Sequence, residues 1–159
     1  MKKITLLLGL AFLAFSCSSD DDGGSSPEDL IGAWQFTERT IDGIQEELDS
    51  CQQMGILIFS EDILTQTFFF EDASENCVSD GVDMDSYEAT SDTIIITFLE
   101  DGEEEMVVVD YSINGSELTI SFEQEEDVED EDGNLVRDED GNRRTEIVNF
   151  TDVYIRVTE

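Results

Sequence analysis

The sequence contains no histidine, and its only lysines, Lys2 and Lys3, lie at the extreme N-terminus. The absence of histidine removes the usual general base and zinc ligand, together with every Ser-His or Cys-His catalytic pair. The absence of lysine from the rest of the chain excludes Schiff-base chemistry and the lysine of a phosphate-binding loop. Carboxylates are too numerous to single out a catalytic pair. We therefore expect a protein that is not an enzyme.

Basic residues are scarce as well, because seven of them face 41 acidic residues and give a formal net charge of −34. A chain of this charge is repelled by nucleic acid and by anionic lipid headgroups. We therefore expect no nucleic-acid partner, and any membrane association must come from an acyl anchor. The acidity itself is interpreted either as a means of keeping the protein soluble or as a means of binding cations.

Residues 1–16 are typical of an export signal. Lys2 and Lys3 supply its positive charge, an apolar run covers 4–15, and the small Ser16 ends it. The run is shorter than the ~20 residues that span a bilayer and suits the core of a signal peptide. A short buried helix is the alternative interpretation.

The tetrapeptide Ala-Phe-Ser-Cys that ends at Cys17 resembles a bacterial lipobox. The resemblance implies that the Cys17 thiol is acylated and becomes the new N-terminus, which anchors the protein to a membrane. Residues 17–29 are acidic and rich in glycine and serine, so they are predicted to form a flexible tether. This tether also resembles the acidic export signal of surface lipoproteins in certain Gram-negative bacteria, which implies an outer-membrane lipoprotein exposed at the cell surface. A plain solvated spacer is the alternative.

From residue 32 onward the apolar residues recur mainly with a period of two, which is typical of β-strands. Residues 117–123 alternate polar and apolar side chains without a fault, which predicts a strand with one face in water. Asn114-Gly115 between two such runs is a strong hairpin signal. The only proline, Pro27, precedes the first strand and interrupts no ladder. The predicted strands are 33–41, 54–60, 63–71, 84–90, 93–100, 104–113, 117–123 and 146–157.

About eight strands with short connections predict an all-β domain over residues 30–159. The strands would form an antiparallel meander that closes into an up-and-down barrel, because closure removes the exposed edges. A two-sheet β-sandwich is the alternative. Helix is limited to one turn at 27–31. The predicted inward-facing residues are Trp34, Phe36, Leu57, Phe59, Val107, Val109, Leu118, Ile120 and Phe122.

Two cysteines, Cys51 and Cys77, remain once Cys17 is assigned to the anchor. In an exported chain they are able to form one disulfide in an oxidising compartment, and two free thiols are the alternative. Two cysteines without a histidine are too few for a metal site.

The first predicted strand opens with Gly32-Ala33-Trp34, and a Gly-x-Trp strand followed by an antiparallel meander resembles the lipocalin superfamily. The closer likeness is to the lipocalin-like domains of bacterial surface lipoproteins. In those domains a cysteine precedes a strand that ends in phenylalanine, and a second cysteine follows the next strand, as Cys51 and Cys77 do here. The resemblance covers about 28–158 and implies a lipocalin-like barrel.

The resemblance also implies a motif at the base of the barrel. Gly32 lets the chain turn tightly into the barrel floor, and Trp34 plugs the closed end. In typical lipocalins a late arginine stacks on this tryptophan, and Arg156 fits that role, where a cation over an indole is worth ~0.5–2 kcal/mol. An outward-facing arginine on an alternating strand is the alternative. Neither residue is catalytic.

The acidic segment contains the one candidate cation site. Asp130, Asp132 and Asn134 supply oxygen ligands at alternate positions, as Ca²⁺ requires, and Asp138 follows them. The central glycine and the closing glutamate of an EF-hand loop are missing. The two Asp-Gly-Asn copies are also typical of hairpin turns, so a solvated hairpin is the favoured interpretation.

Together these features predict a lipid-anchored surface lipoprotein without enzymatic activity, whose barrel binds a small, mainly apolar ligand or an envelope protein. One alternative is an accessory subunit with a filled barrel, which the ten phenylalanines favour. The other is a Ca²⁺-responsive surface protein that uses residues 127–142. No cofactor other than this Ca²⁺ is expected.

Overall fold

The computed structural model describes residues 25–130, 134–138 and 140–158. The export signal and Cys17 lie outside these residues, so the acylation of Cys17 stays a prediction. No helix within the described ranges has the length and apolar character needed to cross a membrane.

Strands account for nearly all of the regular structure in the described ranges, as the period of two predicts. Only α1 and the 3-10 turn η1 are helical, and α1 is the single turn expected before the first strand. The elements are α1 (Pro27–Leu30), β1 (Gly32–Ile41), β2 (Ile44–Gln45), η1 (Gln52–Met54), β3 (Ile56–Phe59), β4 (Ile63–Thr67), β5 (Phe69–Glu71), β6 (Cys77–Ser79), β7 (Asp83–Ala89), β8 (Thr93–Glu100), β9 (Glu103–Asn114), β10 (Glu117–Asp127) and β11 (Thr145–Arg156).

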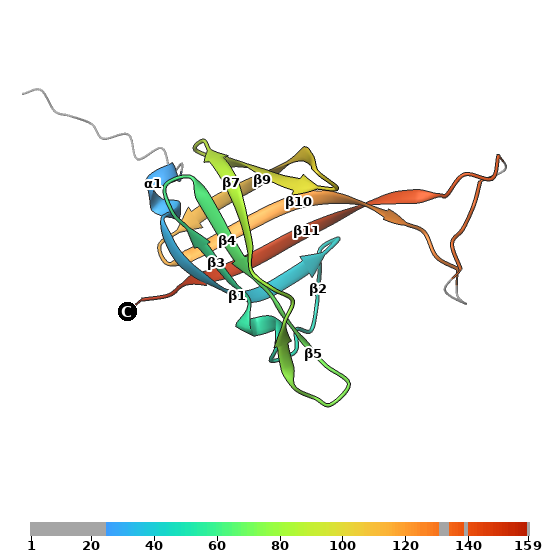
Figure 1. The fold of residues 1–159 in the computed structure, drawn as a ribbon, viewed down its shortest axis with the longest axis horizontal. Helices are drawn as coiled ribbons and strands as arrows, with labels where there is room; N and C mark the ends of the chain where they lie inside the picture. The colour runs from blue at the N-terminus through green and yellow to red at the C-terminus, as the bar shows by residue number, and fades with distance from the viewer. Residues whose placement is uncertain (1–24, 131–133, 139, 159) are drawn as a thin grey trace, which may run out of the picture.

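In the part of the chain that the structure describes, eight strands form a closed antiparallel barrel (Figure 1). The strand order is β11-β10-β9-β8-β7-β4-β3-β1, and β11 pairs again with β1 to close the sheet. β2 pairs with the last two residues of β1, and β5 and β6 form a separate two-stranded hairpin. The structure therefore confirms the closed all-β meander rather than the β-sandwich.

The prediction of a single strand over 63–71 is wrong, because this segment forms two strands that belong to different sheets. β4 ends at Thr67 and stays in the barrel, whereas β5 begins at Phe69 and pairs with β6 outside it. A disulfide between Cys51, beside η1, and Cys77, the first residue of β6, ties this hairpin to the chain before β3. The structure thus confirms the disulfide and excludes two free thiols.

The last hairpin also differs from the prediction, because its strands continue past residue 123. β10 and β11 stay paired out to Asp127 and Thr145, so the first acidic residues after 123 are part of a strand. Figure 1 shows the two strands leaving the barrel together as an arm. Bridges between Glu129 and Leu135 and between Arg137 and Arg143 continue into its tip. We call residues 124–130, 134–138 and 140–145 the acidic arm.

Trp34 closes one end of the barrel, which we call the base. Its side chain is fully buried, and its Nε1 donates a 2.8 Å hydrogen bond to the carbonyl oxygen of Leu30 in α1. The guanidinium carbon of Arg156 lies 4.1 Å from the centre of the Trp34 ring, and Arg156 Nη1 donates to the Ile31 carbonyl at 2.9 Å. Gly32 has φ +133°, and a Cβ there would lie 3.0 Å from Arg156 Nη1, so glycine suits this position.

Two tyrosines fasten the hairpin turns at the base. Tyr87 donates its hydroxyl to the Ser60 carbonyl at 2.5 Å, and Tyr111 donates its hydroxyl to the Thr90 carbonyl at 2.7 Å. The backbone N–H of each tyrosine binds the same turn two residues further along, at Asp62 O and Asp92 O. Burial raises the pKa of both phenols, so they remain neutral donors. The base is therefore held by a repeated pair of bonds.

Candidate functional site

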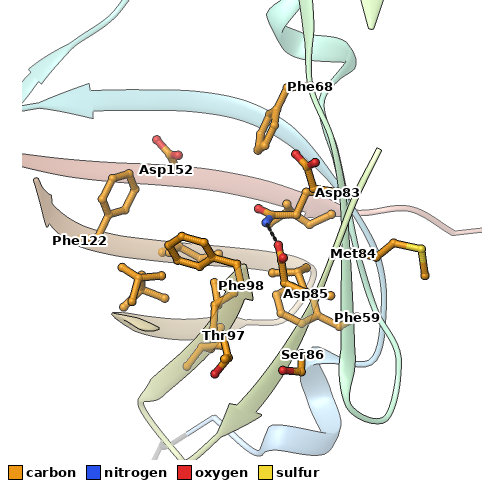
Figure 2. Close-up of a pocket in the computed structure, with 18 of the residues that line it drawn as sticks. Phe59, Phe68, Asp83, Met84, Asp85, Ser86, Thr97, Phe98, Phe122 and Asp152 are labelled. Atoms are coloured by element: carbon orange, nitrogen blue, oxygen red, sulfur yellow. Dashed lines mark hydrogen bonds between the residues drawn. The ribbon is translucent and has the colours of Figure 1, made fainter. Parts of the chain in front are cut away.

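A cavity of about 840 Å³ lies inside the barrel beyond the base (Figure 2). Most of its lining residues are apolar and come from strands β3, β4 and β7 to β11. Six of the nine predicted inward-facing residues line it, namely Leu57, Phe59, Val107, Val109, Ile120 and Phe122. The other three, Trp34, Phe36 and Leu118, are buried in the core without lining the cavity. Cavities of 300–1,000 Å³ are typical of sites for small molecules.

The filled barrel, which the number of phenylalanines favoured, does not agree with this cavity. Two phenylalanines lie in the predicted export signal. Phe69 and Phe70 belong to the outer hairpin, and Phe68 precedes it with 38% of its surface exposed. These aromatic rings therefore contribute little to packing the interior, and a space is left there.

A buried ion pair forms part of the cavity wall. Asp152 on β11 is only 3% exposed, and it accepts hydrogen bonds of 2.7 Å from both Nε and Nη2 of Arg39 on β1. The guanidinium carbon of Arg39 also lies 5.2 Å from the ring centre of Phe36 and 5.7 Å from that of Phe150. The hydrogen bonds to Asp152 raise the pKa of Arg39, so the guanidinium stays protonated beside the carboxylate.

The hydroxyl of Tyr154 lies 3.5 Å from Asp152 Oδ2 and completes this polar cluster. Burial, and next the charge of Asp152, raise the pKa of Tyr154 far above its usual range. The phenol is therefore a neutral donor at all ordinary pH values. The apolar cavity thus contains a fixed polar group that is able to orient a ligand.

The opposite wall carries a second polar contact, at the place where two strands separate. The pairing of β7 with β8 ends at Ser86 and Thr97, although β8 stays paired with β9 up to its last residue. Asp85 lies just beyond this point and accepts a 3.0 Å hydrogen bond from Gln66 Nε2 on β4. The ring of Phe98 is on the other side of the separation (Figure 2). We call this region the mouth.

Neither polar contact of the cavity was predicted from the sequence. Arg39 and Asp152 are separated by 113 residues, and Gln66 and Asp85 by 19. The sequence does contain a signal for the ion pair. On the last strand the inward-facing positions 148, 150, 152 and 154 are all apolar or aromatic except for Asp152. A charged side chain at an inward position needs a partner, which here stands on the neighbouring strand β1.

Three of the four candidate Ca²⁺ ligands, Asp130, Asn134 and Asp138, lie in the acidic arm, and none of these three lines the cavity. Asp130 accepts a 2.9 Å hydrogen bond from the backbone N–H of Asn134, and Asp138 accepts one of 2.9 Å from Asn142. Bonds from Asn142 and Asp140 lower the pKa of the Asp138 carboxyl. Asp132 lies outside the described residues, so the complete ligand set stays a prediction. Among the residues that are described, no three acidic or cysteine side chains gather as a metal site.

Comparison with known proteins gives one match. A family model for a lipocalin-like domain matches residues 30–120, from the last residue of α1 into β10. No curated protein and no solved structure shows a significant match to the chain. The matched span contains the base tryptophan and most of the residues that line the cavity.

Proposed function

The chain belongs to the family of lipocalin-like domains, and from this premise we propose that it binds a small, mainly apolar molecule inside its barrel and catalyses no reaction. The observation that carries the proposal is the cavity of about 840 Å³, whose lining side chains are mostly apolar. A barrel of eight strands is wide enough either to be filled by side chains or to hold one small ligand. The cavity favours the second case.

The polar groups of the cavity would orient this ligand rather than react with it. Arg39 and Asp152 neutralise one another, and Tyr154 is held as a neutral phenol. A few fixed polar groups in an apolar cavity are the usual source of specificity in small-molecule sites.

The location of the protein is a further part of the proposal. Residues 1–16 have the order of an export signal, and Cys17 follows them where a lipobox cysteine stands. We infer that Cys17 carries the acyl anchor and that the barrel is displayed at the outer-membrane surface, where the ligand or an envelope protein would reach it. Mass spectrometry of the protein extracted from its native membrane should find an acylated Cys17 as the first residue. An unmodified N-terminus at Met1 would contradict the anchor.

Two adjacent valines on β9 allow a matched test of ligand binding. Val107 lines the cavity, whereas Val108 lies on the outer face with 59% of its surface exposed. Val107→Trp would place a large ring in the empty space, and Val108→Trp would place the same ring in solvent. The probe is N-phenyl-1-naphthylamine, a neutral apolar dye whose fluorescence rises when it leaves water.

We expect the wild type and Val108→Trp to bind the dye with the same affinity and Val107→Trp to bind it at least tenfold more weakly. The new indole at 107 fills space rather than displacing a packed neighbour, so circular dichroism should show a folded barrel. If that variant does not fold, Val107→Phe repeats the test with a smaller ring. No binding by the wild type, or equal binding by the variants at 107 and 108, would refute the proposal.

A further inference from the structure

The described lining of the cavity carries more negative than positive charge. Its charged residues are the acidic Asp83, Asp85, Glu104 and Asp152 and the basic Arg39. Arg39 already binds Asp152 through two hydrogen bonds of 2.7 Å, so these two charges cancel. The other three carboxylates face no cation among the described lining residues, and they leave the cavity with a net negative charge.

Two of these carboxylates lie next to aromatic rings at the mouth. Asp83 and Asp85 are two residues apart on β7, so their side chains project from the same side of the strand. Figure 2 shows both carboxylates on the side of the strand where the rings of Phe68 and Phe98 lie. Asp83 is exposed and Asp85 is half-buried, so the pair extends from solvent into the cavity.

We propose that the cavity binds an organic cation, namely an apolar body that carries one protonated or quaternary amine. This proposal rests on the proposed ligand-binding function and names the class of ligand. The body occupies the apolar interior, and the ammonium group lies at the mouth between the carboxylates of Asp83 and Asp85. The faces of Phe68 and Phe98 add to the attraction, because aromatic rings carry negative charge on their faces.

Other classes of ligand fit this cavity less well. A metal ion needs several oxygen ligands around one point, and in the described parts of the chain no three acidic side chains gather in that way. An anion would approach a chain with a net charge of −34 and then meet three carboxylates that face no cation among the described lining residues, so it would be repelled. Gln66 fixes the orientation of the Asp85 carboxylate through its 3.0 Å bond, so this acceptor is already in place for a donor.

Three ligands with the same ring system but different charge test the proposal. They are 1-naphthylmethylamine, 1-naphthylmethanol and 1-naphthylacetate, which are positive, neutral and negative at pH 7. We expect calorimetry at low salt to find the amine bound at least tenfold more tightly than the alcohol, and the alcohol at least tenfold more tightly than the acid. The advantage of the amine should shrink severalfold in 1 M salt, where the screening length falls to ~3 Å.

A matched pair of double variants separates the mouth from the charge of the whole protein. D83N/D85N removes two charges from the cavity lining and keeps the shape of both side chains. E88Q/D110N removes two charges from exposed positions of β7 and β9 that do not line the cavity. We expect D83N/D85N to weaken binding of the amine at least tenfold and to change binding of the alcohol less than twofold, whereas E88Q/D110N changes neither.

The outcomes distinguish the two proposals. If all three ligands bind the wild type equally, if the acid binds best, or if both double variants weaken the amine to the same extent, the cation proposal is wrong and ligand binding stands. If none of the three ligands binds and N-phenyl-1-naphthylamine does not bind either, the proposed function itself fails. Near-UV circular dichroism checks that each variant is folded, and the substitutions are isosteric and lie outside the packed core.

Discussion

Removing one partner of the ion pair between Arg39 and Asp152 should destabilise the barrel far more than removing both. The side chain of Asp152 is 4% exposed and that of Arg39 is 28% exposed. Arg39→Met strands a buried carboxylate, so we expect the free energy of unfolding to fall by ~3–5 kcal/mol. Asp152→Leu strands a guanidinium that water still partly reaches, so the loss should be smaller, about 2–3 kcal/mol.

The double variant R39M/D152L should lie within about 1 kcal/mol of the wild type, because an apolar pair of similar volume replaces the buried charges. The coupling energy between the two sites would then be at least ~3 kcal/mol. Urea denaturation followed by circular dichroism measures the free energy of unfolding of the wild type and the three variants. If this free energy falls with urea concentration at the same slope in all four, their folded and unfolded states are comparable. If the double variant loses as much stability as the sum of the single variants, the two charges act independently and do not form a coupled pair.

Three further predictions concern the cross-link, the base and the buried tyrosines. Reduction of the Cys51–Cys77 disulfide, whose partners are 26 residues apart, should lower the free energy of unfolding by ~3–4 kcal/mol; identical urea curves with and without reductant would exclude this. Arg156→Met removes the stacked cation and the bond to Ile31, so stability should fall by ~1–3 kcal/mol and the emission of Trp34 should change, whereas Arg156→Lys should recover part of both. The pKa values of all three tyrosines are raised by burial in the folded state, so their contribution to stability is complete below pH ~10 and is lost above it, as phenols ionise in the unfolded chain. Absorbance at 295 nm should therefore rise at higher pH in the folded barrel than in the chain unfolded by urea, and equal titration of the two states would contradict this.

The strands could be predicted from the sequence wherever the pattern is local. Residues 117–123 alternate without a fault, and the hairpin at Asn114-Gly115 needs only its own two residues. The run 63–71 could not be divided by the same method, because three consecutive phenylalanines suit either strand. Its break at Phe68 is seen only in the three-dimensional structure, where β5 pairs with β6 and the disulfide from Cys51 holds that hairpin outside the barrel.

The candidate site was harder to predict, because its properties depend on register across the whole barrel. Arg39 faces Asp152 since β1 and β11 pair in one particular alignment, with a shift between Phe36 and Glu38. Moving that alignment by one residue would turn Asp152 outward and remove the pair. Whether the interior is filled or hollow depends on the same alignments in every strand, so the number of phenylalanines could not decide between the ligand-binding barrel and the filled alternative.

The fastening of the hairpin turns by Tyr87 and Tyr111 has a consequence for how a ligand enters and leaves. Amide hydrogens near the base should exchange slowly, through rare global opening, because their strands are tied at the turns and packed on Trp34. The strand ends near Asp83 have lost their partner on β8 and should open locally at much lower free energy. Exchange of a ligand and unfolding of the barrel would then be governed by separate barriers, so residence time and thermal stability could evolve independently of each other.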